Sequence, residues 1–267
     1  MMTANDSPTG SPSDSTSDSA TDSTHDSPSD SAEGSASARR TTESRSDGRS
    51  ADSASAWRQE EPELWLFRHG ATAWAKDGRH TGRTDLPLLP EGEDEARALA
   101  PMLANLPFEQ VWVSPLQRAR RTCELAGLGD RARVEPLLQE WDYGDVEGLT
   151  TAELRQHQPG WSVWRDGCPN GEDAAAVDQR CANLLALLLQ DLPERRPSPP
   201  SQPPAPRRLA LFSHGQFLRA VAAHWIGLGA ASGRLLCLHT ATLSVLGHER
   251  EQRAIVRWNA PSAWTSV

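Results

Sequence analysis

Two histidines that each follow a short apolar run are the first residues of this sequence that could carry out chemistry. His69, preceded by Arg68, comes after the run 64–67, and His214 comes after a similar run at 209–212. Glycine follows each histidine and permits close approach by a ligand. Ligand sites in open α/β sheets gather beyond the carboxyl ends of strands, so neighbouring strands would bring both histidines to one pocket. A lone histidine at a strand end is more often structural, but the repeated arrangement favours a shared ligand site.

A positive cluster around these histidines would suit a phosphate group. Arg118 lies one turn into a helix expected after a strand at 110–113, where its side chain could reach the same pocket. Guanidinium groups bind phosphate oxygens through two parallel hydrogen bonds, so Arg68 and Arg118 indicate a phosphate site. The loop carboxylate of Glu140 could join them, although on its own it would be interpreted as a surface residue. No metal-binding spacing such as HExxH occurs, so the chemistry is expected to need no metal.

The order of apolar runs and helical patterns predicts the elements that would position these residues. Short apolar runs predict strands at 64–68, 110–113, 133–138, 209–212, 235–239, 243–247 and 254–258. Apolar spacing and end signals predict helices at 91–105, 151–157, 174–190 and 216–226. A further helix is expected to start with Ser114 as its cap and Pro115 at its first position. Strands that alternate with helices indicate an α/β domain whose sheet is covered on both faces.

The charge of the chain is concentrated in residues 1–56. The net charge is −9, from 27 basic and 36 acidic residues, and this segment contributes −6 of it. It contains 17 serines and no Val, Ile, Leu, Phe, Tyr or Trp, so we expect a disordered tail. Residues 57–267 form the expected folded domain, with an exposed proline-rich loop at 193–206. Whether the tail is functional or a mis-assigned extension stays open at this point.

Composition argues against several classes of protein. The longest apolar stretch, 184–189, is far shorter than the ~20 residues that span a bilayer, so no membrane partner is expected. The N-terminus also lacks the apolar segment of a secretory signal. Four cysteines without a CxxC pair indicate a reducing compartment, so we expect a cytoplasmic protein. No basic surface or RNA-reading motif indicates a nucleic-acid partner. The expected partner is a small phosphorylated metabolite, and the oligomeric state stays open.

Five short motifs follow one another along the chain. They are Arg68-His69-Gly70, TGRTD at 81–85, SPLQRARRT at 114–122, LQEWDYG at 138–144 and SHG at 213–215. Together they resemble the histidine phosphatase family, whose best-known branch is phosphoglycerate mutase, over residues 64–259.

A finer likeness within that family concerns its branches. Segments 74–82, 161–172 and 242–247 resemble the fungal sedoheptulose 1,7-bisphosphatase branch. Mutases usually carry Asn at the position of Ala75, and they have a longer insertion after the segment that matches 140–144. Both departures count against mutase activity.

The resemblance implies a three-layer sandwich with a central, mostly parallel sheet covered by helices on both faces, as in phosphoglycerate mutase. It also implies a role for each catalytic candidate. His69 would be the nucleophile that forms a phosphohistidine intermediate. Arg68, Arg118 and His214 would bind the phosphoryl oxygens. Glu140 would protonate the leaving group and then activate water. No cofactor is implied.

His69 must be neutral to attack phosphorus. Like-charge repulsion from Arg68 and Arg118 is expected to lower the pKa of its imidazole. A backbone carbonyl on the other ring nitrogen would fix the tautomer.

Further side chains are candidates for contact with the substrate. The phosphate-loop candidates are Thr72, Thr81 and the Gly82 amide, and Tyr143 is a candidate substrate contact. For a second phosphate, the bisphosphatase branch has an arginine at the position of Arg219, and Ser114 is a further candidate. The roles of Arg83, Arg165 and Arg250 stay open.

The first hypothesis for function is a metal-independent phosphatase that acts on small sugar phosphates, with a sedoheptulose-type bisphosphatase as its finer form. A broad-specificity acid phosphatase and a phosphoglycerate mutase are the alternatives. A catalytically dead phosphate-binding scaffold is a more remote one, because every residue that the family chemistry requires is present.

Overall fold

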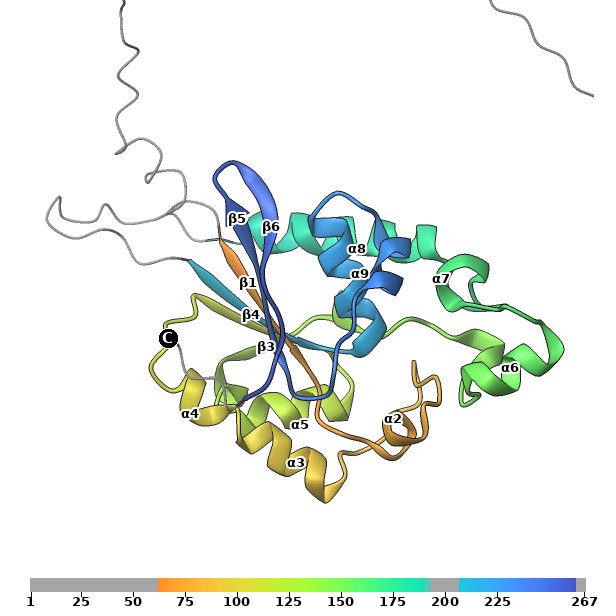
Figure 1. Cartoon of the computed structure of the whole chain (residues 1–267). Coiled ribbons are helices and arrows are strands. Elements are labelled where there is room, and N and C mark those ends of the chain that lie inside the picture. Colours follow the sequence, from red (N-terminus) through yellow and green to blue (C-terminus); the bar gives the residue numbers. More distant parts are fainter. Residues whose placement is uncertain (1–61, 191, 193–206, 263–267) are drawn as a thin grey trace, which may run out of the picture. The chain divides into compact units, whose positions relative to one another are not determined.

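A computed structural model of the chain describes residues 62–190, 192 and 207–262. The predicted disordered tail at 1–56 and the predicted proline-rich loop at 193–206 lie outside the described residues. The described part contains a sheet of six strands in the order β3-β2-β4-β1-β5-β6 (Figure 1). The strands are Glu63–Arg68 (β1), Gln110–Val113 (β2), Ala132–Val134 (β3), Arg208–Ser213 (β4), Leu243–Glu249 (β5) and Gln252–Ala260 (β6).

The sheet is mixed, with a parallel part that carries the predicted histidines. β2 is parallel to both β3 and β4, and β4 is parallel to β1. β5 runs antiparallel to β1 and to β6. The predicted α/β class with a mostly parallel sheet is therefore confirmed.

Helices cover both faces of this sheet, with α3, α4 and α5 on one face and α8 and α9 on the other (Figure 1). The α-helices are Ala73–Asp77 (α2), Pro90–Arg97 (α3), Ala100–Leu103 (α4), Gln117–Leu125 (α5), Thr151–His157 (α6), Val163–Asp166 (α7), Ala174–Gln190 (α8) and Gly215–Trp225 (α9). Short 3₁₀ helices cover Gly129–Arg131 (η2), Pro136–Leu138 (η3), Gly144–Val146 (η4) and Ala230–Leu235 (η5).

Two hydrophobic cores follow from the alternation of side chains along the strands. Leu209 and Leu211 of β4 pack in the core beneath α8 and α9. Ala210 and Phe212 of the same strand pack in the core beneath α4 and α5. All four side chains are fully buried, which explains why a central parallel strand is a continuous apolar run.

The register between β1 and β4 brings the two histidines together. Leu64 is paired with Leu209, and Arg68 with Ser213, so both strands end at the same edge of the sheet. The residue after each strand is the predicted histidine. The two apolar runs seen in the sequence are therefore neighbours, as the shared-pocket hypothesis requires.

One predicted helix is wrong in its length. The helix expected at 91–105 is divided into α3 and α4, which are separated by Ala98 and Leu99. Pro101 lies in the first turn of α4. A proline inside a continuous helix would lack an N–H donor and would clash with the carbonyl four residues earlier, so the helix restarts there.

Two further elements differ from the prediction because of prolines or competing contacts. The strand predicted at 133–138 is reduced to β3, since Pro136 begins the short helix η3. The helix predicted from Ser114 begins instead at Gln117, with Leu116 as its cap. The Ser114 hydroxyl is hydrogen-bonded to a histidine and does not cap the helix.

The strand predicted at 235–239 does not form. Leu235 ends the helix η5 and is 68% exposed, and residues 236–239 have no regular structure. The carbonyl of Leu238 accepts a hydrogen bond from Arg68. The segment therefore contacts the end of β1 through a side chain rather than by strand pairing.

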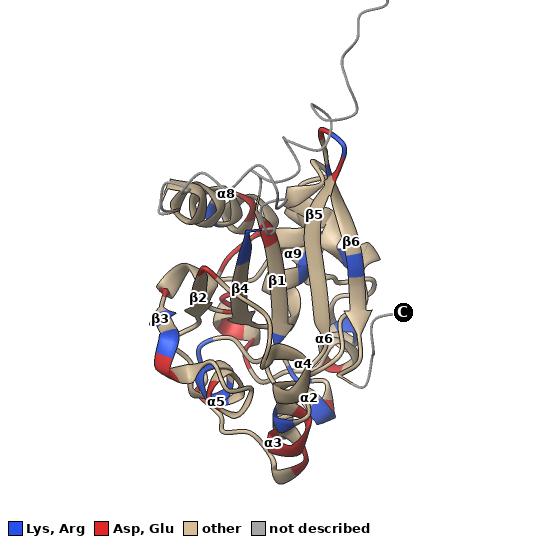
Figure 2. Cartoon of the chain, turned by 90° about the vertical axis from the view of Figure 1, so that its left-hand side faces the viewer, with Lys and Arg blue, Asp and Glu red and all other residues tan. Residues whose placement is uncertain are grey.

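Acidic residues predominate on α3 and basic residues on α5 (Figure 2). Glu93 of α3 forms ion pairs with Arg97 on the same helix and with Arg121 on α5. Within the described ranges, no helix has both the length and the hydropathy required to cross a bilayer.

Candidate active site

A hollow of about 160 Å³ lies beyond the carboxyl ends of β1 and β4. Of the residues predicted from the sequence, it is lined by Arg68, His69, Thr81, Glu140 and Tyr143. These residues come from segments that are far apart in the sequence. The structure therefore assembles one site from the first strand, the loop after it and the loop before α6.

His69 is buried and held by two backbone contacts. Its main-chain N–H donates to the Ser213 carbonyl at 3.0 Å, which extends the pairing of β1 and β4. Its Nδ1 lies 2.7 Å from the Gly70 carbonyl oxygen. Because a carbonyl can only accept, Nδ1 carries the proton and Nε2 keeps its lone pair. The predicted carbonyl that fixes the tautomer is therefore present.

The imidazole of His69 is held in its neutral form. Burial, then the positive charges of Arg118 and Arg68, hold its pKa well below the usual range. The hydrogen bond to the Gly70 carbonyl acts in the opposite direction but is the smaller effect. The predicted influence of the two arginines on this pKa is confirmed, and burial adds to it.

Arg68 supplies a buried donor that faces no acceptor. Its Nη1 donates to the Leu238 carbonyl at 2.6 Å, whereas its Nε is buried without a hydrogen-bond partner among the described residues. A Cβ atom at Gly215 would lie 3.2 Å from this Nε. Glycine therefore lets the guanidinium lie against the start of α9. Arg68 also lines the hollow, so its positive charge lies beside any anion bound there.

His214 is fully buried, and its ring centre lies 5.2 Å from that of His69. Its Nδ1 accepts a hydrogen bond from Nε of Arg118 at 3.2 Å. Its Nε2 must then carry the proton, which it donates to the Ser114 hydroxyl at 2.7 Å. Burial, followed by the charge of Arg118, holds the pKa of His214 well below the usual range. The two histidine rings are therefore close together, as predicted, but His214 does not line the hollow. Its contact with the phosphoryl oxygens stays a prediction.

Arg118 is fully buried behind the hollow and binds the loop that follows His80. Its Nη1 donates to the Thr84 carbonyl at 2.9 Å, and its Nη2 donates to the carbonyls of Thr81 and Gly82, each at 3.0 Å. In this structure Arg118 therefore fixes a wall of the hollow and acts on His69 through its charge. Its direct contact with phosphate stays a prediction.

Glu140 lies at the N-terminus of α9, on the edge of the hollow. Its Oε1 accepts hydrogen bonds from the backbone N–H groups of Trp141, at 2.9 Å, and Phe217, at 2.8 Å. Its Oε2 accepts one from the N–H of Gln216 at 3.0 Å. A carboxylate offers about four acceptor positions in all. The position not used by these three bonds is on Oε2, which makes Oε2 the oxygen able to exchange a proton.

The carboxylate of Glu140 is also attracted electrostatically to the N-terminus of α9. Backbone N–H groups at a helix N-terminus carry a partial positive charge that attracts a carboxylate. The glutamate that looked like a surface residue in isolation is only 8% exposed.

Tyr143 is buried in the wall of the hollow, with its ring 4.7 Å from that of His80. Burial, reinforced by the charge of Glu140, raises the pKa of its phenol well above the usual range. The hydroxyl therefore stays protonated. Tyr143 therefore packs in the core and also lines the hollow, and its contact with the substrate stays a prediction.

Three predicted phosphate contacts are engaged within the protein instead. Thr72 is fully buried and caps α2, accepting a hydrogen bond from the N–H of Ala75. The Gly82 amide donates to both carboxylate oxygens of Glu147, at 2.9 and 3.0 Å. Ser114 is fully buried against His214. Each of the three supports the site in this structure, and none of them lines the hollow.

Arg219, the candidate for a second phosphate, lies on α9 beside the site. Its Nε donates to the Gly233 carbonyl at 3.1 Å, and its guanidinium lies 4.7 Å from the centre of the Trp164 ring. Burial is the main cause that lowers the pKa of Arg68, and the positive charge of Arg219 acts in the same direction. It does not line the hollow itself.

The three arginines whose roles were open lie on the surface. Arg83 forms an ion pair with Asp142 at 2.6 Å, and Arg165 forms one with its neighbour Asp166. Arg250 is 75% exposed in its side chain. The hollow is lined by other residues.

Sequence reasoning missed several residues of the hollow. His80 lies in its wall, packed against Tyr143 and Trp161, although no pattern in the sequence gave it a partner. Burial lowers its pKa, so the ring is neutral. Arg79 and Thr151 also line the hollow. The sequence feature that could have indicated Arg79 and His80 is their position, because they directly precede the TGRTD motif.

The described residues contain no group of three or more His, Cys, Asp and Glu side chains arranged to hold a metal ion.

Comparisons with known proteins agree with this geometry. The profile of the family "Histidine phosphatase superfamily (branch 1)" matches residues 64–261. A Mycobacterium tuberculosis protein named acid phosphatase is 38% identical over 194 residues, which cover 72% of this chain and 89% of that relative. A Saccharomyces cerevisiae protein named sedoheptulose 1,7-bisphosphatase is 36% identical over 192 residues, which cover 63% of this chain and 69% of that relative.

A solved structure shows the same fold. It belongs to the product of a Mycobacterium tuberculosis open reading frame and matches with a TM-score of 0.67 at 36% sequence identity, covering 75% of this chain and 98% of that one. The family profile spans the parallel part of the sheet except for Glu63, the first residue of β1, and includes every predicted catalytic residue. The chain therefore belongs to the histidine phosphatase superfamily, branch 1, and is a phosphatase of that family.

Proposed function

We propose that this protein hydrolyses phosphate monoesters of small sugars through a phosphohistidine intermediate on His69. The observation that carries the proposal is the state of this imidazole. Burial and two arginines keep it neutral, and the Gly70 carbonyl holds the proton on Nδ1. A neutral ring with a free lone pair on Nε2, at the edge of a polar hollow, is a nucleophile for phosphorus.

In the first step, Nε2 of His69 attacks phosphorus and the bond to the ester oxygen breaks. Glu140, protonated on Oε2, gives its proton to the departing oxygen, so the sugar leaves as an alcohol. Negative charge spreads over the three remaining phosphoryl oxygens in the transition state. Arg68 lines the hollow, so its guanidinium is placed to stabilise this charge.

In the second step, water attacks the phosphohistidine and the N–P bond breaks. The Glu140 carboxylate takes the proton from this water on Oε2, which restores the starting state. Inorganic phosphate leaves the hollow.

The size and chemistry of the hollow favour a small polar substrate. Its volume of about 160 Å³ is well below the ~300–1,000 Å³ typical of pockets for drug-sized ligands. Arg79, His80, Thr151 and Gln216 add polar groups to its wall. A phosphoryl group on a short polyol suits this wall better than a large apolar ester does. The relatives named acid phosphatase and sedoheptulose 1,7-bisphosphatase are consistent with such substrates.

A panel of phosphate esters tests the proposal. Phosphate release would be measured for sugar monophosphates, sedoheptulose 1,7-bisphosphate, phosphoglycerate and para-nitrophenyl phosphate, with His69→Ala as the blank. We expect sugar phosphates to give the highest kcat/KM, and the seven-carbon bisphosphate to stand out. Equal activity across the panel would instead show a broad-specificity acid phosphatase. Isomerisation that depends on a bisphosphate primer, without net phosphate release, would show a mutase.

Removing the Arg68 charge is expected to alter both rate and pH dependence. Arg68→Met should lower kcat/KM by about 10²- to 10³-fold, because a positioned donor for the transition-state charge is lost. It should also raise the pKa of His69, since Arg68 lowers it. The imidazole then becomes protonated, and unreactive, at a higher pH. The loss of kcat/KM in the variant relative to wild type should therefore become larger as the pH is lowered.

The ratio of variant to wild-type kcat/KM across the pH range is the relevant measurement, because titration of the substrate cancels in it. Arg97→Met serves as the control, since Arg97 is half-exposed and paired with Glu93 and Asp94 on α3. A ratio that stays constant with pH for Arg68→Met would contradict the assigned influence on His69.

Arg219 is the proposed contact for a second phosphate. Its guanidinium lies on the same helix as the two N–H groups that bind Glu140, and its charge acts on Arg68. Arg219→Met is expected to lower kcat/KM for bisphosphates more than for monophosphates of the same sugar, by about 10-fold for a lost charged hydrogen bond. Equal losses for both kinds of substrate would remove Arg219 from the second subsite.

A further inference from the structure

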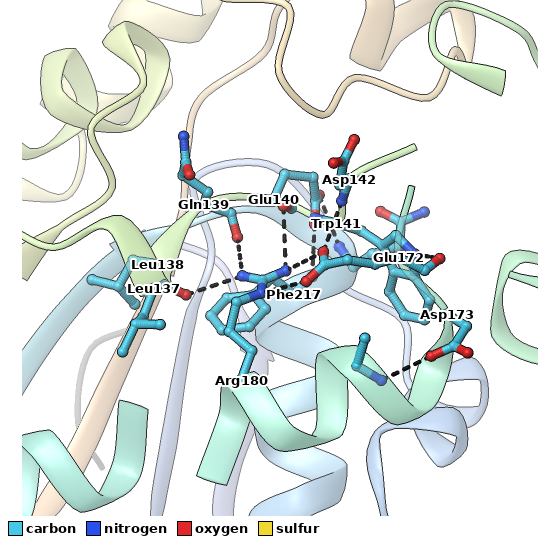
Figure 3. A network of polar contacts seen from close by, with 12 residues as sticks. Leu137, Leu138, Gln139, Glu140, Trp141, Asp142, Glu172, Asp173, Arg180 and Phe217 are labelled. Atoms are coloured by element: carbon cyan, nitrogen blue, oxygen red, sulfur yellow. Dashed lines mark hydrogen bonds and ion pairs between the residues drawn. The ribbon is translucent and has the colours of Figure 1, made fainter. Parts of the chain in front are cut away.

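Arg180 of α8 does not line the hollow but makes an unusually complete set of contacts with the loop that carries Glu140 (Figure 3). Its Nη1 donates to the carbonyls of Leu137, at 3.0 Å, and Gln139, at 2.7 Å. Its Nη2 donates to the carbonyl of Glu140 at 3.3 Å. Nε and Nη2 also donate to the two carboxylate oxygens of Glu172, at 2.8 and 2.7 Å. A guanidinium has five N–H donors, so every donor of Arg180 is used.

Glu172 connects the same arginine to the other end of the loop. Its Oε2 also accepts a hydrogen bond from the N–H of Asp142 at 2.9 Å. Its backbone N–H donates to the Asp142 carbonyl, and its own carbonyl accepts from the indole Nε1 of Trp141, both at 2.9 Å. Residues on both sides of Glu140 are therefore bound to this ion pair (Figure 3).

A third connection passes through α9. The guanidinium of Arg180 stacks over the ring of Phe217 at 4.0 Å. The backbone N–H of Phe217 is one of the donors that hold the Glu140 carboxylate. Arg180 therefore contacts the backbone that carries Glu140 and the residue that binds its side chain.

We propose that the Arg180–Glu172 pair is the positioning device for Glu140, and that it sets the aim of Oε2 into the hollow. The proposal rests on the proposed role of Glu140 as proton donor. Arg180 acts through Glu140 and does not line the hollow. The planar guanidinium group has five N–H donors in fixed directions, so it can hold several acceptors in a defined geometry at once. An ammonium group cannot do this.

The contacts favour positioning over a general contribution to stability. A partly buried ion pair by itself is weak support for stability, because desolvation opposes the attraction between the charges. Here the side chains of Arg180 and Glu172 are 14% and 21% exposed, and three of the five donors point at loop carbonyls. Proton transfer is sensitive to small displacements, and an error of about 1 Å can cost about 10²-fold in rate.

Two substrates with different leaving groups can distinguish a residue that positions the acid from a residue that only stabilises the fold. para-Nitrophenolate departs without a proton, whereas a sugar alkoxide departs only when protonated. kcat/KM reports the first irreversible step, in which the leaving group departs. The measurement is the ratio of kcat/KM for para-nitrophenyl phosphate to that for the sugar phosphate that wild type hydrolyses fastest.

We expect Arg180→Met to lower kcat/KM for the sugar phosphate by about 10- to 100-fold and that for para-nitrophenyl phosphate by less than about 3-fold. Arg180→Lys should recover part of the loss. In the Glu140→Gln background, Arg180→Met should cause little further change in the ratio, because the two residues act as a unit. An equal loss for both substrates, or unchanged kcat/KM in a folded variant, would overturn the proposal.

Two additional variants complete the design. Arg207→Met is the matched control, because Arg207 forms a similar two-pronged ion pair with Glu109 at the opposite end of β4. It should leave the ratio unchanged. Glu172→Gln tests the same device if Arg180→Met does not fold, since an amide oxygen can still accept a hydrogen bond from the N–H of Asp142 but cannot form the two-pronged ion pair with Arg180. The same selective loss is expected for it, and an equal loss for both substrates would count against positioning.

The outcome also separates this proposal from the proposed function. If Glu140→Gln itself leaves the ratio unchanged, the assignment of Glu140 as proton donor fails. If Glu140→Gln raises the ratio and neither Arg180→Met nor Glu172→Gln does, only the positioning device fails.

Discussion

Replacement of His69 by alanine is expected to lower kcat/KM for every phosphate monoester by roughly 10⁴-fold or more. The variant loses the atom that would bond to phosphorus, and the second histidine at a strand end cannot replace it. His214 has its Nδ1 bound to Arg118 and its Nε2 bound to Ser114. The measurement is phosphate release from the best sugar phosphate and from para-nitrophenyl phosphate.

The loss should not result from unfolding. His69 contributes one side-chain hydrogen bond to the buried Gly70 carbonyl, so its removal should cost about 1–3 kcal/mol in the free energy of unfolding. Thermal unfolding of the variant checks this point. His157→Ala, an exposed histidine at the end of α6, is the matched control and should keep wild-type activity. A His69→Ala protein with wild-type activity would refute the assignment.

Replacement of Glu140 by glutamine is expected to produce the second-largest effect, and a selective one. kcat/KM for the sugar phosphate should fall by about 10²- to 10⁴-fold, the usual contribution of a positioned proton donor. The fall for para-nitrophenyl phosphate should be below about 10-fold, because its leaving group needs no proton. The amide keeps the size of the side chain but cannot transfer a proton from the Oε2 position.

Glu124→Gln is a suitable control for this variant, since Glu124 is exposed on α5 and pairs with Arg121. This control should leave kcat/KM unchanged for both substrates. Equal losses for both substrates with Glu140→Gln would mean that the carboxylate orders the site and is not the proton donor.

Much of the fold could be predicted from local sequence. Helices α6 and α8 have the predicted bounds, because Thr150 and Glu153 form a capping box at one and a long apolar pattern defines the other. β2 was also predicted to the residue. The errors occurred where one residue overrides a pattern, as Pro101 and Pro136 do. The strand expected at 235–239 does not form, because an alternation of apolar residues does not by itself provide a neighbouring strand to pair with.

The core of the site was predictable because it follows directly from strand ends. Arg68 and His69 end one strand and His214 follows the next, so the register of two parallel strands is enough to bring them together. Glu140 needed the family resemblance. The bonds from α9 that hold its carboxylate join residues more than 70 positions apart.

The supporting residues could not be predicted, since their partners are set by tertiary packing. Arg180 lies in a helix whose sequence shows only an apolar face, and nothing in its spacing points to the loop at 137–140. Gly82 was the right residue type for a phosphate loop. Its amide is bound by Glu147, a loop residue that no motif connects with it.

The central claim is that the phosphoryl group passes through His69, and trapping the intermediate tests it most directly. Glu140→Gln with para-nitrophenyl phosphate is the suitable combination, because the first step needs no proton donor while the second lacks its base. Rapid denaturation in alkali followed by peptide mass spectrometry should find one phosphoryl group, stable in base and labile in acid, on His69. A phosphoryl group on another residue, or turnover with no phosphorylated protein, would contradict the mechanism.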